Sequence, residues 1–357
     1  MTSSPLLPGR LGTPTMTLRD DPRADPRMIA AMEPFGLADP PAPIPLDITC
    51  SVADLLAWVD TAEEGFETLF AAVVAELPPV PGVERSSEVI AGPHGHDITL
   101  FVHRPAGITA DLPGVLHLHG GGMAMLEAAG PAYVRWRDSL AAAGMVVVGV
   151  EFRNAAGKHG AHPFPAGLDD CAAGLRWTVD HRAELGIGPL IVSGESGGGN
   201  LTLATVMRAK RDGLLGEIAG VYAMCPYISG QWAAPPPELT SLVENDGYFL
   251  EVAMMGVLAR SYDPDGANAT NPLAWPLHAG PDDLAGLPPH VISVNQLDPL
   301  RDEGLTHARK LLDAGVPVVS RTVNGTCHAG DIIFAAALPD VYAATIRDIA
   351  GFANSLE

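Results

Sequence analysis

One serine stands in a setting that suits nucleophilic chemistry. The chain reads GESGG over residues 194–198, between the apolar residues 190–192 and a helical segment that begins near Gly198. A strand, a tight turn and a helix in this order form the context of a nucleophile elbow, in which the turn exposes a serine hydroxyl at the top of a sheet. The turn is strained and leaves no room for bulk beside the serine, so glycine fits the flanking positions. The pattern predicts that Ser196 is a nucleophile.

Two other interpretations of this glycine-rich turn are a helix cap and a dinucleotide-binding loop. A dinucleotide loop needs G-x-G-x-x-G early in the chain, with an acid about 20 residues later. That arrangement is absent from this sequence. A helix cap therefore stays as the plain alternative to a nucleophile.

A second glycine run follows an apolar run nearer the N-terminus. His119-Gly120-Gly121-Gly122-Met123 comes directly after the strand-like residues 114–118. Three glycines after a strand let backbone N–H groups converge on one point, which is what a developing oxyanion needs. A flexible loop between a strand and a helix would look the same, but the serine turn favours the oxyanion interpretation.

A serine nucleophile needs a base, and the base needs an acid that orients it. In enzymes with this elbow the acid and then the histidine follow the serine, each after a later strand. Asp298 follows the strand-like VISVNQL, and His328 follows the strand-like PVVSRTVN. Asp302 is the rival acid, but it lies one turn into a predicted helix, where we expect it to cap or brace the loop. The order predicts a Ser196, Asp298 and His328 relay.

The rest of the chain must place these residues at one edge of a sheet. Short apolar runs alternate with helical segments, which predicts an α/β fold with a parallel sheet covered by helices on both faces. The predicted strands are 114–118, 145–150, 190–193, 220–224, 291–294 and 317–323. The predicted helices are 132–143, 167–183, 198–212, 301–314 and 341–355.

Residues before the first parallel strand divide into three parts. Residues 1–48 are rich in Pro, Asp and Ala with a short helical stretch near 26–35, so they either stay loose or lie over the rest as part of a lid. Apolar residues at helical spacing predict a helix over 52–77. Two stretches of period two, 87–91 and 97–103, predict an antiparallel hairpin.

The alternation breaks between residues 229 and 287, which predicts an insertion above the sheet. We therefore expect four parts along the chain. They are an N-terminal segment with part of a cap (1–80), the first part of a catalytic domain (81–228), the cap insertion (229–287) and the second part of the catalytic domain (288–357).

Composition excludes several classes of protein. The chain has 357 residues, of which 47% are hydrophobic and 18% charged, so a wholly disordered protein is excluded. It carries 42 acidic and 21 basic residues, for a formal net charge of −21. Such a surface repels phosphate backbones and anionic lipids, so we expect no nucleic-acid partner and no membrane partner.

The four cysteines, Cys50, Cys171, Cys225 and Cys327, lie far apart in the chain and form no CxxC pair. We therefore expect neither a disulfide framework nor a thiol metal site. No apolar run approaches the roughly 20 residues that span a bilayer, and the first 21 residues lack the apolar core of a signal peptide. A cytoplasmic protein is the expectation.

Four motifs together resemble one known family. HGGGM, GESGGGN, DPLRDEG and GTCHAGD, in this order and spacing, are similar to the hormone-sensitive-lipase-like branch of the α/β-hydrolases. The likeness covers most of the chain from about residue 85 and is weak over the first 45 residues. It implies an α/β-hydrolase fold with an eight-stranded, mostly parallel sheet. It also implies a helical cap made of N-terminal helices and an insertion after the strand that follows the elbow.

The resemblance also implies roles for single residues and the activity of a carboxylester hydrolase that needs no cofactor and no metal. The nucleophile would be Ser196, the general base His328 and its partner Asp298. The oxyanion hole would be formed by the backbone N–H groups of Gly121, Gly122 and Gly197. His119 would brace the glycine loop, and Glu195 would act in a supporting network.

Two motifs depart from the commoner family pattern. The elbow has Glu195 and Gly197 where Asp and Ala are commoner, and Ala329 follows His328 where glycine is expected. The second departure concerns the fine geometry of the histidine loop.

The substrate is less constrained by the sequence. Apolar side chains that could line an acyl or alcohol pocket are Met123, Trp232, Phe249 and Met254, although methionine also fills gaps in a core. The compact insertion favours short acyl chains. Segments such as SLVENDGYFLE resemble a macrolactone esterase, which adds bulky or cyclic esters. The expected partner is a small-molecule ester substrate. A homodimer is a further possibility, because relatives are often dimers.

Two other functions and one metal site remain as alternatives to a metal-free ester hydrolase. The same residues could hydrolyse an amide or formamide. The chain could also be a small-molecule receptor on this scaffold. Receptors of this kind lose the histidine, however, and His328 is present. His94-x-His96 could bind a metal, but no third ligand stands at the right spacing.

Overall fold

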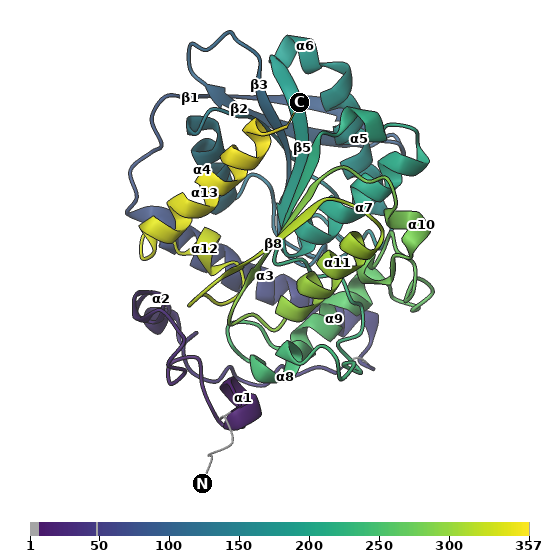
Figure 1. The fold of residues 1–357 in the computed structure, drawn as a ribbon. Coiled ribbons are helices and arrows are strands. Elements are labelled where there is room, and N and C mark those ends of the chain that lie inside the picture. The colour runs from purple at the N-terminus through teal and green to yellow at the C-terminus, as the bar shows by residue number, and fades with distance from the viewer. Residues whose placement is uncertain (1–6, 48, 357) are drawn as a thin grey trace.

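Eight strands form one sheet in the order β1-β2-β4-β3-β5-β6-β7-β8 in the computed structural model, which describes residues 7–47 and 49–356 (Figure 1). The strands are β1 (Val83–Ala91), β2 (Asp97–Pro105), β3 (Leu112–Leu118), β4 (Val146–Val150), β5 (Ile187–Glu195), β6 (Gly220–Met224), β7 (His290–Asn295) and β8 (Val318–Val323). β2 runs antiparallel to β1 and β4, and the other neighbours pair in parallel. The predicted hairpin and parallel strands are all present.

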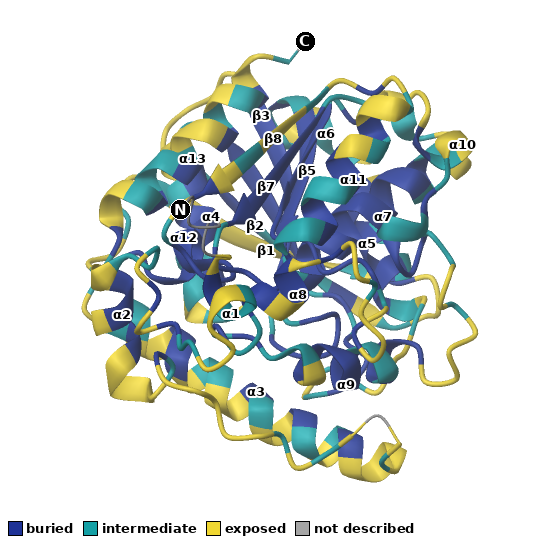
Figure 2. Ribbon diagram, turned by 60° about the horizontal axis from the view of Figure 1, so that its bottom comes forward, coloured by how far each residue is buried: buried dark blue, intermediate teal, exposed yellow. Residues whose placement is uncertain are grey.

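The central strands read as unbroken apolar runs because both faces of the sheet are covered. Every residue of β4 is buried, as is every residue of β6 and β7. β1 is mostly exposed because it lies at an edge of the sheet. Figure 2 shows the same contrast, with the inner strands buried.

Helices cover the two faces of the sheet. α4 (Pro131–Ala142) and α13 (Pro339–Asn354) contact each other on one face, and α5 (Ala166–Asp180) contacts α7 (Gly197–Arg211) on the other. α11 (Arg301–Asp313) packs on β7 and β8 (Figure 1). The shorter elements here are α6 (Arg182–Leu185), η2 (Leu215–Glu217) and α12 (Gly330–Ile333).

The N-terminal segment lies against the rest of the chain. Its elements are α1 (Gly9–Gly12), α2 (Pro26–Met32), η1 (Glu33–Phe35) and α3 (Val52–Ala75). The backbone N–H of Asp25 donates to the carbonyl of Gly325, 2.9 Å away, and the guanidinium of Arg23 pairs with Glu244. The described part of residues 1–48 therefore lies over the rest of the chain, while residues 1–6 and 48 lie outside the described residues.

The insertion above the sheet contains α8 (Ser241–Glu244), α9 (Val252–Tyr262), η3 (Pro276–His278) and α10 (Pro281–Leu284). α9 packs against α3, so the N-terminal helix and the insertion meet above the carboxyl ends of the strands (Figure 1). The outer face of α3 is exposed, and its inner face is buried (Figure 2).

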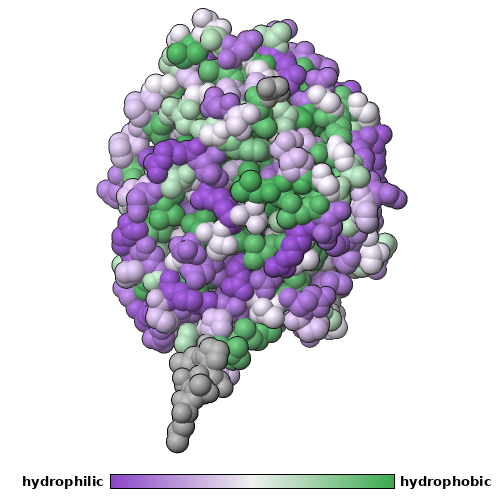
Figure 3. Space-filling view, in the orientation of Figure 1, coloured by the Kyte–Doolittle hydropathy of each residue, from purple (hydrophilic) through white to green (hydrophobic). Residues whose placement is uncertain are grey.

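Hydrophobic and hydrophilic side chains alternate over the face seen in Figure 3. A hydrophobic patch lies near the centre of that view, where Figure 1 places β8, and Val319 of this strand is 61% exposed. Within the described ranges, no helix is long and apolar enough to cross a membrane.

Candidate active site

Ser196 occupies the sharp turn between β5 and α7. Its backbone angles, φ 57° and ψ −119°, lie in a strained region for a side-chain-bearing residue. A Cβ at Gly194 would stand 2.3 Å from the carbonyl oxygen of Leu118, which explains the glycine before the elbow. The backbone N–H of Ser196 donates to the carbonyl of Met224 at 3.0 Å and ties the turn to the neighbouring strand. The turn places the Ser196 side chain at the wall of a pocket.

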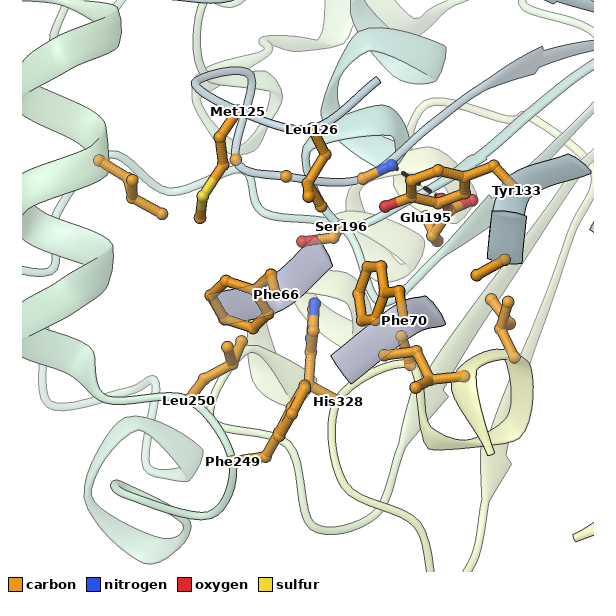
Figure 4. Close-up of a pocket in the computed structure, with 18 of the residues that line it drawn as sticks. Phe66, Phe70, Met125, Leu126, Tyr133, Glu195, Ser196, Phe249, Leu250 and His328 are labelled. Atoms are coloured by element: carbon orange, nitrogen blue, oxygen red, sulfur yellow. Dashed lines mark hydrogen bonds between the residues drawn. The ribbon is translucent and has the colours of Figure 1, made fainter. Parts of the chain in front are cut away.

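The acid and the histidine meet as the sequence order predicts. Nδ1 of His328 lies 2.8 Å from Oδ2 of Asp298, and both side chains are buried. The other carboxylate oxygen of Asp298 accepts the backbone N–H of Leu300 at 2.8 Å, which fixes the carboxylate plane. In Figure 4 a ring nitrogen of His328 points toward the hydroxyl of Ser196. Among the described residues, that hydroxyl has no hydrogen-bond partner, so it is free to bond to the imidazole that faces it.

The loop that carries His328 is held from two sides. Asn295, at the end of β7, donates to Asp331 at 2.9 Å and accepts the backbone N–H of Ala329 at 3.1 Å. Ala329 has φ 51°, so it adopts the left-handed conformation that a glycine would take at lower cost. On the other side, the sulfur of Met28 accepts the backbone N–H of Cys327 at 3.4 Å. These contacts account for the departure from the commoner His-Gly sequence.

The glycine loop curls tightly against the elbow. Gly121 and Gly122 have φ 107° and 63°, and a Cβ at Gly197 would stand 2.7 Å from the nitrogen of Gly122. The backbone N–H groups of these three glycines donate to no other described residue. Gly120, by contrast, donates its N–H to Oε1 of Glu195 at 2.7 Å. The unpartnered donors therefore lie together beside Ser196.

Two buried histidines stand behind this loop. Oε2 of Glu195 lies 3.2 Å from Nε2 of His117, so the carboxylate links the loop to β3. His119 stacks on Phe152, with ring centroids 4.2 Å apart, and its Nδ1 bonds to the carbonyl of Gly120 at 2.7 Å. Burial lowers the pKa of His119 to about 3, so the ring is neutral at ordinary pH. Its geometry is that of a brace, because the neutral ring donates its one N–H proton to the carbonyl of Gly120.

The pocket beside Ser196 is walled by apolar side chains from three parts of the chain (Figure 4). Its empty space, including the open mouth, is about 700 Å³. α3 supplies Phe66 and Phe70, and the insertion supplies Phe249, whose ring centroid lies 6.1 Å from that of Phe66. Other apolar lining residues are Met125, Leu126, Leu250, Met254, Met255, Leu258, Ile332 and Ile333. The walls suit an uncharged substrate.

Two of the four expected pocket residues line this space and two do not. Phe249 and Met254 line it. Trp232 instead stacks on Tyr227 at 3.9 Å and donates its indole N–H to Glu303 at 2.7 Å, so it belongs to the packing under the insertion. Met123 is 2% exposed and lies in the glycine loop outside the lining. The structure thus places Trp232 and Met123 outside the lining of this pocket, because residue type alone does not show where a side chain points.

Asp302 supports the insertion. One of its carboxylate oxygens accepts the backbone N–H of Ser241 at 2.8 Å, at the start of α8. The neighbouring Glu303 is fully buried and accepts four donors at once, from the backbone of residues 228 and 229 and from the side chains of Ser229 and Trp232. Both acids thus fasten the root of the insertion to α11.

Two groups of side chains resemble metal ligands. Sγ of Cys225, an oxygen of Asp298 and a nitrogen of His328 lie within 4.8 Å of one another. Burial raises the pKa of the Cys225 thiol well above its ordinary value, and Nδ1 of the histidine is already bonded to the carboxylate. A protonated thiol is a poor ligand, so the arrangement fits packing better than metal binding.

The His94 and His96 pair is engaged elsewhere. His96 bonds to Asp170 at 2.8 Å, and His94 lies 3.2 Å from the guanidinium of Arg153, which itself pairs with Asp170. The positive guanidinium of Arg153 lies against His94 and Asp170 and so repels a metal cation at this place. The sequence did not reveal the supporting residues Asn295, Met28 and Glu303, whose partners are far away in the chain.

Comparison with known proteins identifies the family. Residues 115–331 match the family described as α/β-hydrolase fold. Among solved structures, the chain is similar to brefeldin A esterase, described as a bacterial homologue of human hormone-sensitive lipase. The TM-score is 0.95 and the identity 48%, over 97% of this chain and 98% of that one.

Two curated relatives come from Mycobacterium tuberculosis. Esterase LipI is 33% identical over 243 residues, which are 67% of this chain and 72% of that protein. Carboxylesterase NlhH is 32% identical over 267 residues, which are 73% of this chain and 79% of that protein. The predicted fold and the predicted ester hydrolysis are confirmed. The chain belongs to the α/β-hydrolase family, in the branch related to hormone-sensitive lipase, and is a carboxylesterase.

Proposed function

We propose that Ser196, His328 and Asp298 form the catalytic triad of this carboxylesterase, with the N–H groups of Gly121, Gly122 and Gly197 as its oxyanion hole. The observation that carries the proposal is the 2.8 Å bond between His328 and Asp298 beside the strained elbow of Ser196. This bond leaves the second ring nitrogen of the histidine free to take the serine proton.

The first half of the reaction acylates the serine. The hydroxyl oxygen of Ser196 attacks the ester carbonyl carbon, and its proton passes to Nε2 of His328. The carbonyl electron pair moves onto oxygen, where the three backbone donors stabilise the charge. The carbon–oxygen bond to the alcohol then breaks, and the alcohol leaves with the proton from Nε2.

The second half releases the acid. Water enters the pocket and gives a proton to Nε2 while its oxygen attacks the acyl carbon. The proton returns to the oxygen of Ser196 as the acyl bond breaks. Throughout, Asp298 stabilises the imidazolium that forms and holds its orientation. It accepts a hydrogen bond from Nδ1–H of His328, and the proton stays on the ring.

The substrate that fits best is a neutral ester with an apolar acyl group, either short or bulky and cyclic. Apolar walls and the acidic surface both disfavour an anionic substrate. The 48% identical relative is named for brefeldin A, which makes that ester one member of a test panel. The panel also holds p-nitrophenyl esters of graded acyl length and lactones of graded ring size.

Ser196→Ala tests the triad. We expect turnover of p-nitrophenyl butyrate to fall by roughly 10⁴-fold or more, with residual activity from the oxyanion hole. Ser87→Ala, on the exposed strand β1, is the matched control and should keep full activity. Unchanged turnover in Ser196→Ala would reject the triad.

Amide hydrolysis is the alternative chemistry for the same residues. Matched ester and amide substrates with one acyl group separate the two, since an amide-selective enzyme would turn over the amide at least as fast. Binding of a panel compound without turnover would instead revive the receptor hypothesis for that compound.

We further propose the division into a cap (1–80 and 229–287) and a catalytic domain (81–228 and 288–357), a cytoplasmic location and a homodimer. The packing of α3 on α9 supports the cap, and exposed Val319 on the edge strand β8 supports a contact between copies. Light scattering after size separation tests the dimer, and cell fractionation tests the location.

A further inference from the structure

A buried carboxylate on the cap helix reaches into the catalytic domain. Glu63 of α3 is 2% exposed. Its Oε1 accepts the backbone N–H of Leu126 at 2.6 Å, and its Oε2 accepts the backbone N–H of Lys158 at 2.8 Å. A Cβ at Gly157 would stand 2.5 Å from Oε2, so the glycine makes room for this approach. Both oxygens of one cap residue are thus used on the backbone of two loops.

The first of these loops carries unfavourable backbone conformations. Leu126 has φ 74° and Met123 has φ 57°, although neither is a glycine. Such conformations persist only where the surroundings hold them. At Leu126 both backbone polar groups are held from outside the loop, the N–H by Glu63 and the carbonyl by the side-chain amide of Asn154 at 2.7 Å.

The conformation at Leu126 is passed on to the glycines beside Ser196. The backbone N–H groups of Ala124 and Met125 both donate to the carbonyl of Gly121, at 3.0 and 3.1 Å. A Cβ at Gly121 would stand 2.1 Å from the carbonyl oxygen of Met125, so the two ends of the loop are in close contact. A shift at Leu126 therefore moves Gly121.

The same helix also touches the pocket. Phe66 and Phe70, three and seven residues after Glu63, lie on the same face of α3 and line the pocket. We propose that Glu63 is a positioning residue that holds the oxyanion loop from the cap, so that the oxyanion hole is complete only when α3 is docked. This inference rests on the oxyanion hole assigned under the proposed function.

Glu63→Gln tests the inference with little change in size. A glutamine offers one acceptor oxygen and turns its NH₂ toward the second backbone N–H, so one of the two bonds is lost. We expect kcat for p-nitrophenyl butyrate to fall about 10- to 100-fold while KM changes less than about threefold, since the hole acts on the transition state. The protein concentration is taken from active-site titration, which counts only folded and reactive molecules.

Glu67→Gln is the matched control. Glu67 lies one turn further along α3 and also binds Lys158, but through the exposed ammonium at 2.6 Å rather than through the backbone. This variant should keep wild-type kcat. A second readout is the affinity for a trifluoromethyl ketone, which forms a tetrahedral adduct on the serine. That affinity should weaken in Glu63→Gln by about the same factor as kcat.

Three results would overturn the inference. They are a wild-type kcat per titrated site in Glu63→Gln, a loss confined to KM, and an unchanged affinity for the ketone. If Glu63→Gln does not fold, Glu63→Asp gives the same test, because its shorter side chain cannot reach both backbone groups and should lower kcat in the same direction. An active Ser196→Ala would instead reject the proposed function itself, which keeps the two failures distinguishable.

Discussion

Gly197 offers a quantitative test of how closely the glycine loop must approach the elbow. Alanine is commoner at this position in the family, but here a Cβ would stand 2.5 Å from the nitrogen of Met123 and 2.7 Å from that of Gly122. Ordinary contact begins at about 3.4 Å, so Gly197→Ala must push the loop away by roughly 0.9 Å. The contacting atoms belong to the backbone, so the loop cannot yield through a side-chain rotation.

A displacement of this size removes most of one oxyanion hydrogen bond. A donor about 2.9 Å from the oxyanion would move to about 3.8 Å, beyond hydrogen-bonding distance. Losing one such donor costs on the order of 100-fold in kcat, or about 2.7 kcal/mol of transition-state stabilisation. KM should stay within about threefold of the wild-type value, because the ground-state carbonyl uses the hole only weakly.

The assay is initial-rate hydrolysis of p-nitrophenyl butyrate by Gly197→Ala and by Gly351→Ala. Gly351 lies in α13, and a Cβ there has no atom within 4 Å, so the control should match the wild-type enzyme in both kcat and KM. A wild-type kcat in Gly197→Ala would refute the reasoning. It would mean that the loop can retreat by nearly an ångström without loss of the oxyanion hole.

Three further outcomes follow from the same geometry. Asp298→Asn should lower kcat by about 10³- to 10⁴-fold without unfolding the protein, measured by ester hydrolysis and circular dichroism, because the histidine then loses the acceptor that fixes its tautomer. Phe249→Ala should raise the activity on octanoate relative to butyrate esters, and an unchanged chain-length profile would exclude the ring from the acyl site. Burial lowers the pKa of His119 to about 3, that of His290 to about 4 and that of His307 to about 3. As the pH falls below about 6.5, the unfolded chain therefore binds protons at these histidines before the folded chain does. Each of these histidines should therefore lower the free energy of unfolding by about 1 kcal/mol when the pH falls from 7.5 to 5.5. Urea denaturation measures this change, and a free energy of unfolding that stays constant over that range would contradict the prediction.

The sequence predicted those features that depend on local pattern and chain order. Apolar runs between helical segments indicated the parallel strands, and the order Ser196, Asp298, His328 predicted which side chains would meet. The predicted strands are present, and Asp298 and His328 lie together, because parallel strands end at one edge of a sheet and bring together residues that follow different strands. The glycines of the two turns were recognisable because a strained turn excludes other residues.

The supporting contacts depend on tertiary packing and leave no local pattern. Nothing in the helical spacing of α3 separates the buried Glu63 from the half-exposed Glu67 four residues later. Trp232 and Phe249 are both aromatic and both in the insertion, yet only Phe249 lines the pocket. A side chain's direction follows from how two elements cross, and a single sequence does not contain that information.

The contact between Met28 and Cys327 joins positions 299 residues apart. During translation Met28 emerges from the ribosome long before Cys327, whose backbone N–H donates to its sulfur, has been synthesised. Because domains form as their chain emerges, most of the sheet can assemble while the early segment still lacks its binding surface. The contact of Met28 with Cys327 can form only after β8 has been synthesised, so a nascent chain arrested before β8 would carry Ser196 without His328.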